Sequence, residues 1–369
     1  MTHEEYMREA IGLAVKGKGF VSPNPMVGAI IVRDGKIIGK GWHKKYGDLH
    51  AERTAFADCD SRGVDCTGAD MYVTLEPCCH HGKQPPCTEA VAEHGIKRVF
   101  VGSADPNPLV AGKGIQYLRE HGIEVTEDVL RSECDAINEI FFKFITTRLP
   151  FVTMKYAMTM DGKIACYTGE SKWITGEEAR MDVQNDRLKH SAIMVGAGTV
   201  LADDPMLTCR LENGRNPVRI ICDSHLRTPL DSNIVKTAAD VPTIIATLEM
   251  GERSKAYTES GCTVLVTKEK DRHIDLCDLM KKLGEMKIDS VLLEGGGTLN
   301  WSALSAGIVD KVNAYVAPKI FGGAGAKSPV GGIGVDLPVN AFMLEKPDIR
   351  RIGDDILIES RVKNVHGNN

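Results

Sequence analysis

The stretch from His50 to Cys87 organises the chain. It opens with His50-Ala51-Glu52 and closes with Glu76-Pro77-Cys78-Cys79-His80-His81-Gly82-Lys83-Gln84-Pro85-Pro86-Cys87. Imidazole and thiolate groups suit zinc, and a site with three protein ligands leaves a fourth position open for a water molecule. We therefore expect His50, Cys78 and Cys87 to hold one zinc ion.

Glu52 is expected to stay off the metal. A bound zinc ion brings the pKa of its water down to about 7, and the glutamate of the H-x-E signature in zinc deaminases carries protons between that water and the substrate. A structural zinc site without catalysis is the alternative interpretation. Such a site normally has four protein ligands and leaves Glu52 without a role.

The spacing of the two cysteines departs from the P-C-x-x-C signature of most zinc deaminases. Eight residues separate Cys78 from Cys87. The side chains in between that can bind zinc, namely Cys79, His80 and His81, therefore remain competing ligands.

The sequence around these residues predicts how they are presented. A helix is expected from Ala51 to Asp58, directly after the histidine, and a strand from Met71 to Leu75 leads to Cys78. Cys87 is expected to open a second helix, from Thr88 to His94. Helix N-termini lower thiol pKa values and so favour the thiolate form that a metal needs.

Composition limits the class of protein. A chain of 369 residues predicts two domains, and Leu149-Pro150 marks their boundary, giving domains 1–148 and 149–369. The net charge of −5 and the pI of about 6.1 offer no basic surface for nucleic acid. Without an apolar run of about 18 residues or a signal peptide, and with eleven scattered cysteines, a cytoplasmic chain with free thiols is expected.

In the first domain, Thr2 and Glu5 predict a capping box, and a single helix is expected from Val129 to Phe144. The overall pattern is a sheet with helices on its faces. Asp105 and Asn107 follow a short strand, at the end where open α/β sheets place ligands. Asn24 either contacts a substrate ring or makes a local turn between two prolines.

In the second domain, β-rich runs alternate with helical patterns, which favours an α/β sheet with several parallel strands. Thr175 and Glu178 predict another capping box. The strand Ser290–Leu293 leads into Glu294-Gly295-Gly296-Gly297-Thr298. Glycines between a strand and a helix let backbone N–H groups approach a pyrophosphate, although a simple tight connection is an equal alternative and the G-x-G-x-x-G pattern is absent.

Several motifs together resemble one family, the bifunctional riboflavin biosynthesis deaminase/reductases. The deaminase half is matched by Ser22–Gly28, His43, His50-Ala51-Glu52, the Pro77–Cys87 loop and Asp105–Pro108. The reductase half is matched by Lys155-Tyr156-Ala157, Met160–Ala165, Gly169–Thr175 and Val200–Pro205. The resemblance implies a cytidine-deaminase-like three-layer α/β/α domain, followed by a dihydrofolate-reductase-like α/β domain that uses NADPH.

The resemblance also implies roles for individual residues. Facing the dinucleotide would be Ala157, Trp173, Thr199, Asp203, Ser224 and the Gly296–Ser302 turn, including Gly297 and Thr298. Facing a substrate would be Asn24, Asp105 and Asn107 in the first domain and Ser171, Arg187, Leu207, Arg210 and Glu294 in the second. Both arginines could form charge-assisted forks on a phosphate, whereas each would otherwise be a solvated charge. Lys155 would be a proton donor or a sugar contact, or else a surface-strand lysine.

The implied activity has two steps. The first is zinc-dependent hydrolytic deamination of 2,5-diamino-6-(5-phosphoribosylamino)pyrimidin-4(3H)-one, and the second is NADPH-dependent reduction of the ribose of 5-amino-6-(5-phosphoribosylamino)uracil. The partner would be this small molecule, not nucleic acid or membrane, and a homo-oligomer (dimer or tetramer) is expected. The alternatives are a deaminase fused to a dinucleotide-binding regulatory module, and a zinc-stapled ligand-binding protein without catalysis.

Overall fold

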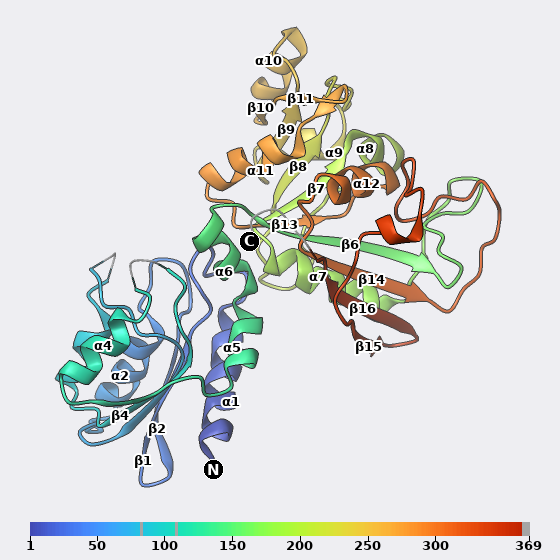
Figure 1. Cartoon of the computed structure of the whole chain (residues 1–369). Helices are drawn as coiled ribbons and strands as arrows, with labels where there is room; N and C mark the ends of the chain where they lie inside the picture. Colours follow the sequence, from blue (N-terminus) through green and yellow to red (C-terminus); the bar gives the residue numbers. More distant parts are fainter. Residues whose placement is uncertain (82–83, 108–109, 364–369) are drawn as a thin grey trace. The chain divides into compact units, whose positions relative to one another are not determined.

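The structure is a computed structural model that describes residues 1–81, 84–107 and 110–363 (Figure 1). The chain divides into two compact units, Met1–Thr147 and Arg148–Asn369. Each unit has its own sheet and its own hydrophobic core. Within the described residues, no helix is both long enough and apolar enough to cross a membrane.

The first unit is built on a five-stranded sheet with the order β2-β1-β3-β4-β5. Its strands are β1 (Gly28–Arg33), β2 (Lys36–Trp42), β3 (Asp70–Leu75), β4 (Arg98–Ser103) and β5 (Glu124–Thr126). Strand β1 is antiparallel to both of its neighbours, whereas β3, β4 and β5 are parallel. The carboxyl ends of β3 and β4 therefore meet at one edge, where the predicted site residues follow.

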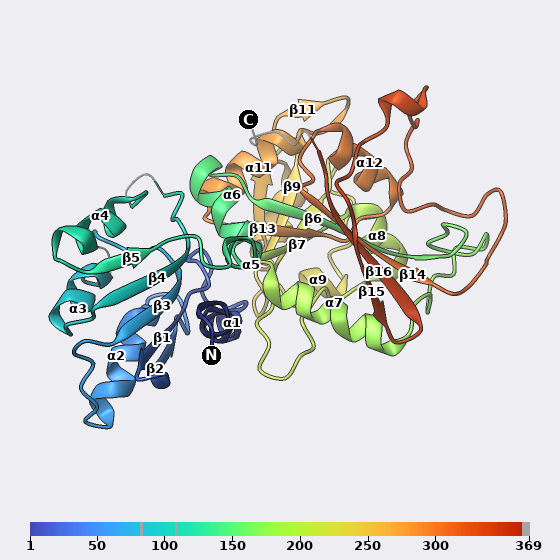
Figure 2. The same ribbon diagram turned by 60° about the horizontal axis from the view of Figure 1, so that its bottom comes forward.

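Side chains alternate across this sheet, as the two-residue period of a strand requires. Ile30 and Tyr72 pack with α1 (His3–Ala14) and α5 (Arg131–Ile137). Ala29, Ile31, Met71 and Val73 pack on the other face, against α2 (Ala51–Ser61), α3 (Cys87–Glu93) and α4 (Lys113–Glu120). Figure 2 shows α1 and α2 on opposite sides of the strands. The predicted three-layer α/β/α architecture is confirmed.

The ends of the helices show where sequence patterns succeed and fail. The predicted capping box of α1 is present, with Thr2 and Glu5 bonded reciprocally at 3.2 and 2.8 Å; a short 3₁₀ turn, η1 (Val15–Gly17), follows α1. The single helix predicted from Val129 to Phe144 is wrong, because α5 ends and α6 (Glu139–Thr147) begins around Asn138. The buried Asn138 amide instead bonds the backbone of Met26 at 2.8 and 2.9 Å.

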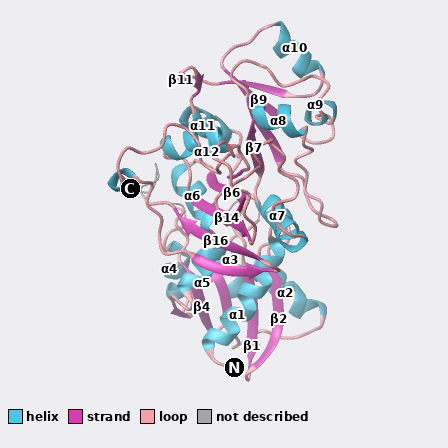
Figure 3. Cartoon of the chain, turned by 90° about the vertical axis from the view of Figure 1, so that its right-hand side faces the viewer, coloured by secondary structure: helices cyan, strands magenta, loops and turns pink. Residues whose placement is uncertain are grey.

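The second unit holds a nine-stranded sheet with the order β10-β9-β8-β7-β13-β6-β14-β16-β15. Figure 3 shows its strands in magenta. Its strands are β6 (Phe151–Thr159), β7 (Ala192–Gly196), β8 (Val218–Cys222), β9 (Thr243–Thr247), β10 (Thr263–Val266), β13 (Ser290–Leu293), β14 (Lys311–Ala317), β15 (Asp348–Ile352) and β16 (Asp355–Arg361). The pairs from β10 through β14 are parallel, and β16 and β15 add antiparallel pairs at one edge. Strand β13 lies between β6 and β7, although it comes much later in the chain. A separate ribbon is formed by β11 (Glu269–Lys270) and β12 (His273–Ile274).

Helices cover both faces of this sheet. On one face, α11 (Leu276–Glu285) and α12 (Gly297–Ser305) pack over the largest core. The other face carries α7 (Glu177–Lys189), α8 (Ala197–Asp203), α9 (Asn233–Lys236) and α10 (Glu252–Glu259); a short 3₁₀ turn, η2 (Pro338–Asn340), lies near the C-terminus. The predicted α/β sheet with parallel strands is confirmed.

The capping box predicted from Thr175 and Glu178 is wrong. Helix α7 begins one residue later than that pattern requires, with Gly176 as its N-cap and no capping bond from a side chain of its own. The Gly176 N–H instead donates to Asp355 Oδ2 at 2.7 Å. A carboxylate at the start of β16 therefore accepts the backbone N–H of the N-cap residue.

Candidate active sites

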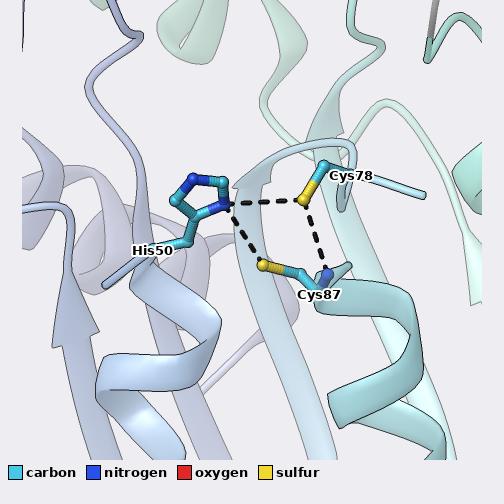
Figure 4. Close-up of side chains that lie close together, drawn as sticks. All are labelled: His50, Cys78 and Cys87. Atoms are coloured by element: carbon cyan, nitrogen blue, oxygen red, sulfur yellow. Dashed lines mark hydrogen bonds between the residues drawn. The ribbon is translucent and has the colours of Figure 1, made fainter. Parts of the chain in front are cut away.

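Three side chains converge at one edge of the first sheet (Figure 4). His50 is the N-cap residue of α2, Cys78 follows β3, and Cys87 is the first residue of α3. His50 Nδ1 lies 3.5 Å from Cys78 Sγ and 3.4 Å from Cys87 Sγ. The Cys87 N–H also points to Cys78 Sγ, at 3.4 Å. All three ligand atoms lie within 4.8 Å of one another.

These separations fit a tetrahedral zinc ion. With Zn–N and Zn–S bonds of ordinary length and tetrahedral angles, the nitrogen and each sulfur would stand about 3.6 Å apart. The observed 3.5 and 3.4 Å match that edge. Two sulfurs and one nitrogen are a donor set that zinc prefers over magnesium or calcium. The geometry therefore accommodates a zinc ion and leaves one coordination position for a non-protein ligand.

The hydrogen bonds among these groups favour a thiolate. A hydrogen bond from Cys87 and another from His50 lower the pKa of Cys78 to about 4. Cys87 is fully buried, and its bond to Cys78 together with burial raises its own pKa. These opposite shifts favour a thiolate at Cys78 and a thiol at Cys87, and a bound zinc ion would displace the Cys87 proton, because zinc binds the deprotonated sulfur.

The described residues of the loop between the cysteines, 79–81 and 84–86, add no further ligand to this cluster. Among the described residues, the group of three or more metal-binding side chains is His50, Cys78 and Cys87. His81 points instead to Glu89, at 3.7 Å. His80 Nδ1 is buried without a hydrogen-bond partner within the part of the chain that the structure describes.

Glu52 lies in the first turn of α2, two residues after His50. Its side chain is 3% exposed. Burial, followed by the charge of Cys78, raises the pKa of this carboxyl to about 6, although a side-chain hydrogen bond with Cys87 opposes the shift. A buried carboxyl beside the ligand cluster is placed to exchange protons there.

Asn24 is held by His43, which sequence reasoning quoted but gave no role. The His43 ring is buried beside the His50 ring, and burial lowers its pKa, which favours the neutral form. Its Nδ1 lies 3.0 Å from the Leu49 carbonyl, which can only accept, so Nδ1 carries the proton. His43 Nε2 then accepts from Asn24 Nδ2 at 3.2 Å, and the Asn24 carbonyl oxygen is left for another donor.

Glu76 is a site residue that sequence reasoning missed. Its buried carboxylate accepts from four backbone N–H groups, those of Asp105, Gly112, Gly114 and Ile115, at 2.9 to 3.3 Å. It thereby caps α4 from the end of β3, in a helix whose own N-cap is a glycine. The signal was a glutamate placed directly before the Pro77-Cys78 pair.

The same contacts fix the position of Asp105. Asp105 is 8% exposed, and its Oδ1 accepts the Asn107 N–H at 2.8 Å. Burial, together with the charges of Glu76 and Cys78, raises the pKa of Asp105 to about 6. The structure thus brings the Asp105 loop close to the cysteine cluster, as the strand pattern predicted.

In the second unit, four predicted residues meet at the carboxyl end of β13. Arg187 of α7 forms a two-pronged ion pair with Glu294, at 2.9 and 3.0 Å. Lys155 Nζ lies 4.0 Å from the same carboxylate. Burial opposes ionisation of Glu294, but the charges of Arg187 and Lys155, with a smaller part from Arg210, lower its pKa to about 2. The Arg187 guanidinium is therefore not a solvated surface charge, because it is largely buried and paired with a carboxylate of the protein.

The glycine turn after Glu294 is tightly packed. Gly296 is the N-cap of α12, and Gly297 is its first residue. A Cβ on Gly297 would lie 2.8 Å from the Ser328 carbonyl, and a Cβ on Gly296 would lie 3.9 Å from Thr199 Oγ1. Thr199 and the glycine turn are thus neighbours, and helix α12 begins at this turn.

The remaining predicted residues are placed as follows. The exposed Trp173 ring stacks against the Arg180 guanidinium at 4.5 Å, and Lys319 Nζ donates to its carbonyl at 2.9 Å. The Leu207 side chain is buried in the core, so only its backbone can face a ligand. Ser224 Oγ accepts the Ile274 N–H at 3.2 Å. Thr298, Asp203 and Arg210 are exposed, whereas Ala157 and Ser171 are half-buried.

Comparison with known families agrees with this division. Residues 1–103 match the cytidine and deoxycytidylate deaminase zinc-binding region. Residues 150–358 match the RibD C-terminal domain. Together the matches define a zinc-binding deaminase domain joined to a reductase domain.

Full-length relatives make the assignment more specific. The chain is 54% identical to the riboflavin biosynthesis protein RibD of Actinobacillus pleuropneumoniae, over 97% of this chain and 95% of that one. It is 38% identical to RibD of Escherichia coli, over 97% and 99%. A crystal structure of a diaminohydroxyphosphoribosylaminopyrimidine deaminase/5-amino-6-(5-phosphoribosylamino)uracil reductase from Thermotoga maritima superposes with a TM-score of 0.85, at 40% identity and over 97% and 98% of the chains.

The chain belongs to the RibD family of riboflavin biosynthesis proteins. The predicted fold classes of the two domains, cytidine-deaminase-like and dihydrofolate-reductase-like, are confirmed. The prediction of a bifunctional enzyme of riboflavin biosynthesis, a hydrolase and an oxidoreductase in one chain, is confirmed as well.

Proposed function

We propose that the first domain removes the C2 amino group of 2,5-diamino-6-(5-phosphoribosylamino)pyrimidin-4(3H)-one and releases ammonia. The observation that carries this proposal is the His50, Cys78 and Cys87 cluster at tetrahedral spacing, with the buried Glu52 beside it. The Thermotoga maritima protein that this chain resembles is a diaminohydroxyphosphoribosylaminopyrimidine deaminase. A zinc ion held by the cluster would supply an activated water for attack on the ring carbon.

The remaining work falls to side chains of this chain. Glu52 takes the proton of the attacking water and returns one to the departing amine. Because the amide nitrogen of Asn24 donates to His43, its carbonyl oxygen remains available. This oxygen accepts from an N–H at the edge of the substrate ring. The Asp105 loop, anchored through Glu76, closes the neighbouring side.

We propose that the second domain reduces the ribose of 5-amino-6-(5-phosphoribosylamino)uracil with NADPH, which would deliver a hydride to the sugar C1′. The first turn of α12 offers N–H groups to the dinucleotide phosphates, with Thr199 beside it. Lys155 would protonate the sugar oxygen. This role is supported by the position of its ammonium group, 4.0 Å from the Glu294 carboxylate and 5.8 Å from the centre of the Tyr315 ring. Arg187 and Arg210 bring positive charge for the substrate phosphate.

The deaminase proposal is tested with Glu52→Gln. This variant is expected to bind zinc normally and to release ammonia at least about a thousandfold more slowly, because the proton carrier is gone while the metal ligands remain. Ammonia and zinc content are measured on the same sample. Normal turnover in a zinc-loaded Glu52→Gln protein would remove the role assigned to this residue.

The reductase proposal is tested by following NADPH absorbance when the deaminated intermediate is added. Oxidation of NADPH in proportion to the intermediate is the expected result. The alternative of a deaminase joined to a regulatory module predicts NADPH binding without consumption. NADH in place of NADPH tests the choice of cofactor.

We further propose that the chain works as a homo-oligomer (dimer or tetramer) in the cytoplasm. Strand β15 forms one edge of the nine-stranded sheet, and Ile349 on it is 62% exposed. Antiparallel pairing of β15 with its copy about a point between Ile349 and Arg350 would set Asp348 opposite Arg351, a favourable cross-strand pair. Light scattering on wild type and Ile349→Lys tests whether this edge forms the interface.

The cytoplasmic location is supported by the cysteines. The eleven free thiols suit a reducing compartment.

A further inference from the structure

Arg53, the residue after Glu52, contacts the segment Pro85-Pro86-Cys87, which we call the Cys87 arm. Its Nε donates to the Pro85 carbonyl at 3.2 Å, and its Nη2 donates to the Pro86 carbonyl at 2.8 Å. Two adjacent N–H groups of one guanidinium therefore grip two consecutive carbonyl oxygens. The fork of arginine fits such a pair, and the single ammonium of lysine does not.

The chemistry of the arm explains why it needs an external donor. Proline has no backbone N–H, so the backbone of Pro85 and Pro86 can form hydrogen bonds only through its carbonyl oxygens. Pro86 is the N-cap of α3 and makes no capping bond from its own side chain. Cys87 follows at once as the first residue of that helix. The position of the Cys87 sulfur is thus set by a segment that Arg53 holds.

The other end of the same contact lies on helix α2. That helix carries His50 at its N-cap and Glu52 in its first turn. Arg53 consequently links the element that presents the imidazole and the carboxylate to the element that presents the second thiol. The 3.4 Å separation of His50 Nδ1 and Cys87 Sγ is a distance between the two elements that Arg53 joins.

We propose that Arg53 is a positioning residue of the metal centre, which holds the Cys87 arm against helix α2 and so governs how long zinc is retained. This inference rests on the proposed zinc site. Groups that orient metal ligands typically change metal affinity by about 10- to 100-fold when they are removed. We expect zinc to leave Arg53→Ala about tenfold faster than wild type.

The test measures zinc release from the full-length, zinc-loaded protein to a chromogenic chelator in excess. Arg53→Lys keeps the charge but cannot grip both carbonyls, and is expected to release zinc nearly as fast as Arg53→Ala. The matched control is Arg62→Ala, at the other end of α2, where the guanidinium contacts Asp58 and the Ile38 carbonyl. Its release rate should equal that of wild type.

Turnover gives a second readout that a general folding defect would not produce. Ammonia release by Arg53→Ala should be low when zinc is scarce and should recover when zinc is added in excess. Equal release rates for Arg53→Ala and wild type, or an Arg53→Lys rate equal to wild type, would overturn the positioning role while leaving the zinc site intact. A wild-type chain that binds no zinc would overturn the metal site itself.

Discussion

Arg187 and Glu294, 107 residues apart in the chain, are joined by two parallel hydrogen bonds from the guanidinium nitrogens Nε and Nη2. The two side chains are only 12% and 14% exposed. Helix α7 and the end of β13 are therefore fastened to each other by a pair of nearly buried charges. Arg187 Nη1 donates to the Thr208 carbonyl at 2.9 Å, so three of its five N–H groups are in use.

Breaking this pair on one side should be costly. Replacement of Arg187 by methionine leaves the buried Glu294 carboxylate without its hydrogen-bonded partner, although the charges of Lys155 and Arg210 remain. The loss of one partner of a buried pair typically costs about 3–5 kcal/mol. We expect Arg187→Met to lower the free energy of unfolding of the second domain by that amount. Urea unfolding followed by tryptophan fluorescence measures it.

The double variant separates the pair from its packing. Arg187→Met combined with Glu294→Gln removes both charges, and it should be more stable than Arg187→Met alone. A double variant as unstable as the sum of the two single variants would show that the ion pair contributes no coupling.

The stability of the second domain should depend on the ionisation of Glu294. The pKa of Glu294 falls from its usual 4.5 to about 2. A carboxyl whose pKa is lower in the folded state stabilises the fold above pH 4.5, and that contribution, about 3 kcal/mol, disappears as the pH falls toward 2. Urea unfolding of wild type should weaken over this range more than that of Glu294→Gln. Glu212→Gln, at an exposed position, is the matched control for removal of a carboxylate.

Two glycines should respond oppositely to alanine. Gly12 lies inside α1 with open space around its Cα, so Gly12→Ala should stabilise the first domain by about 0.5–1 kcal/mol. A Cβ on Gly114 would stand 2.1 Å from the Pro77 carbonyl, next to Cys78. Gly114→Ala should therefore destabilise the domain and loosen zinc. Thermal unfolding compares them, and a harmless Gly114→Ala would contradict the close approach.

Removal of metal should uncover thiols. In the zinc-loaded protein the proposed ligands Cys78 and Cys87 would be bound to the metal, so a disulfide reagent should reach neither. After chelation we expect Cys78, which is only half-buried, to react quickly, and Cys87 to follow. Counting reactive thiols on native protein before and after chelation measures the change. A Cys78→Ser variant should lack the fast component.

Features encoded by neighbouring residues were predictable. The capping box of Thr2 and Glu5 involves residues three apart, and it is present. The cluster of His50, Cys78 and Cys87 spans 37 residues, but each ligand stands at the start of a helix or after a strand that its own local pattern predicts. Short-range patterns were therefore sufficient to predict the elements that present these side chains.

Features set by distant partners were not predictable. Asn138 interrupts a helical pattern because its amide serves the backbone of Met26, 112 residues away. Helix α7 begins after Gly176 and not after Thr175, and the Gly176 N–H donates to Asp355, 179 residues later in the chain. The fork of Arg53 on two proline carbonyls leaves no mark in the sequence, since an arginine on a helix is ordinarily solvated. In each case tertiary contact decided what propensity could not.

The place of β13 in its sheet has a consequence for synthesis on the ribosome. Strands β6 and β7 are not hydrogen-bonded to each other, because β13 lies between them in the sheet. They can be joined only after translation has reached Leu293, the last residue of β13. The first unit, whose strand pairs close over much shorter stretches, can assemble while the rest is still being translated. The second unit must instead remain open until most of the chain has emerged, and during that interval its half-built apolar faces are exposed to chaperones and to aggregation.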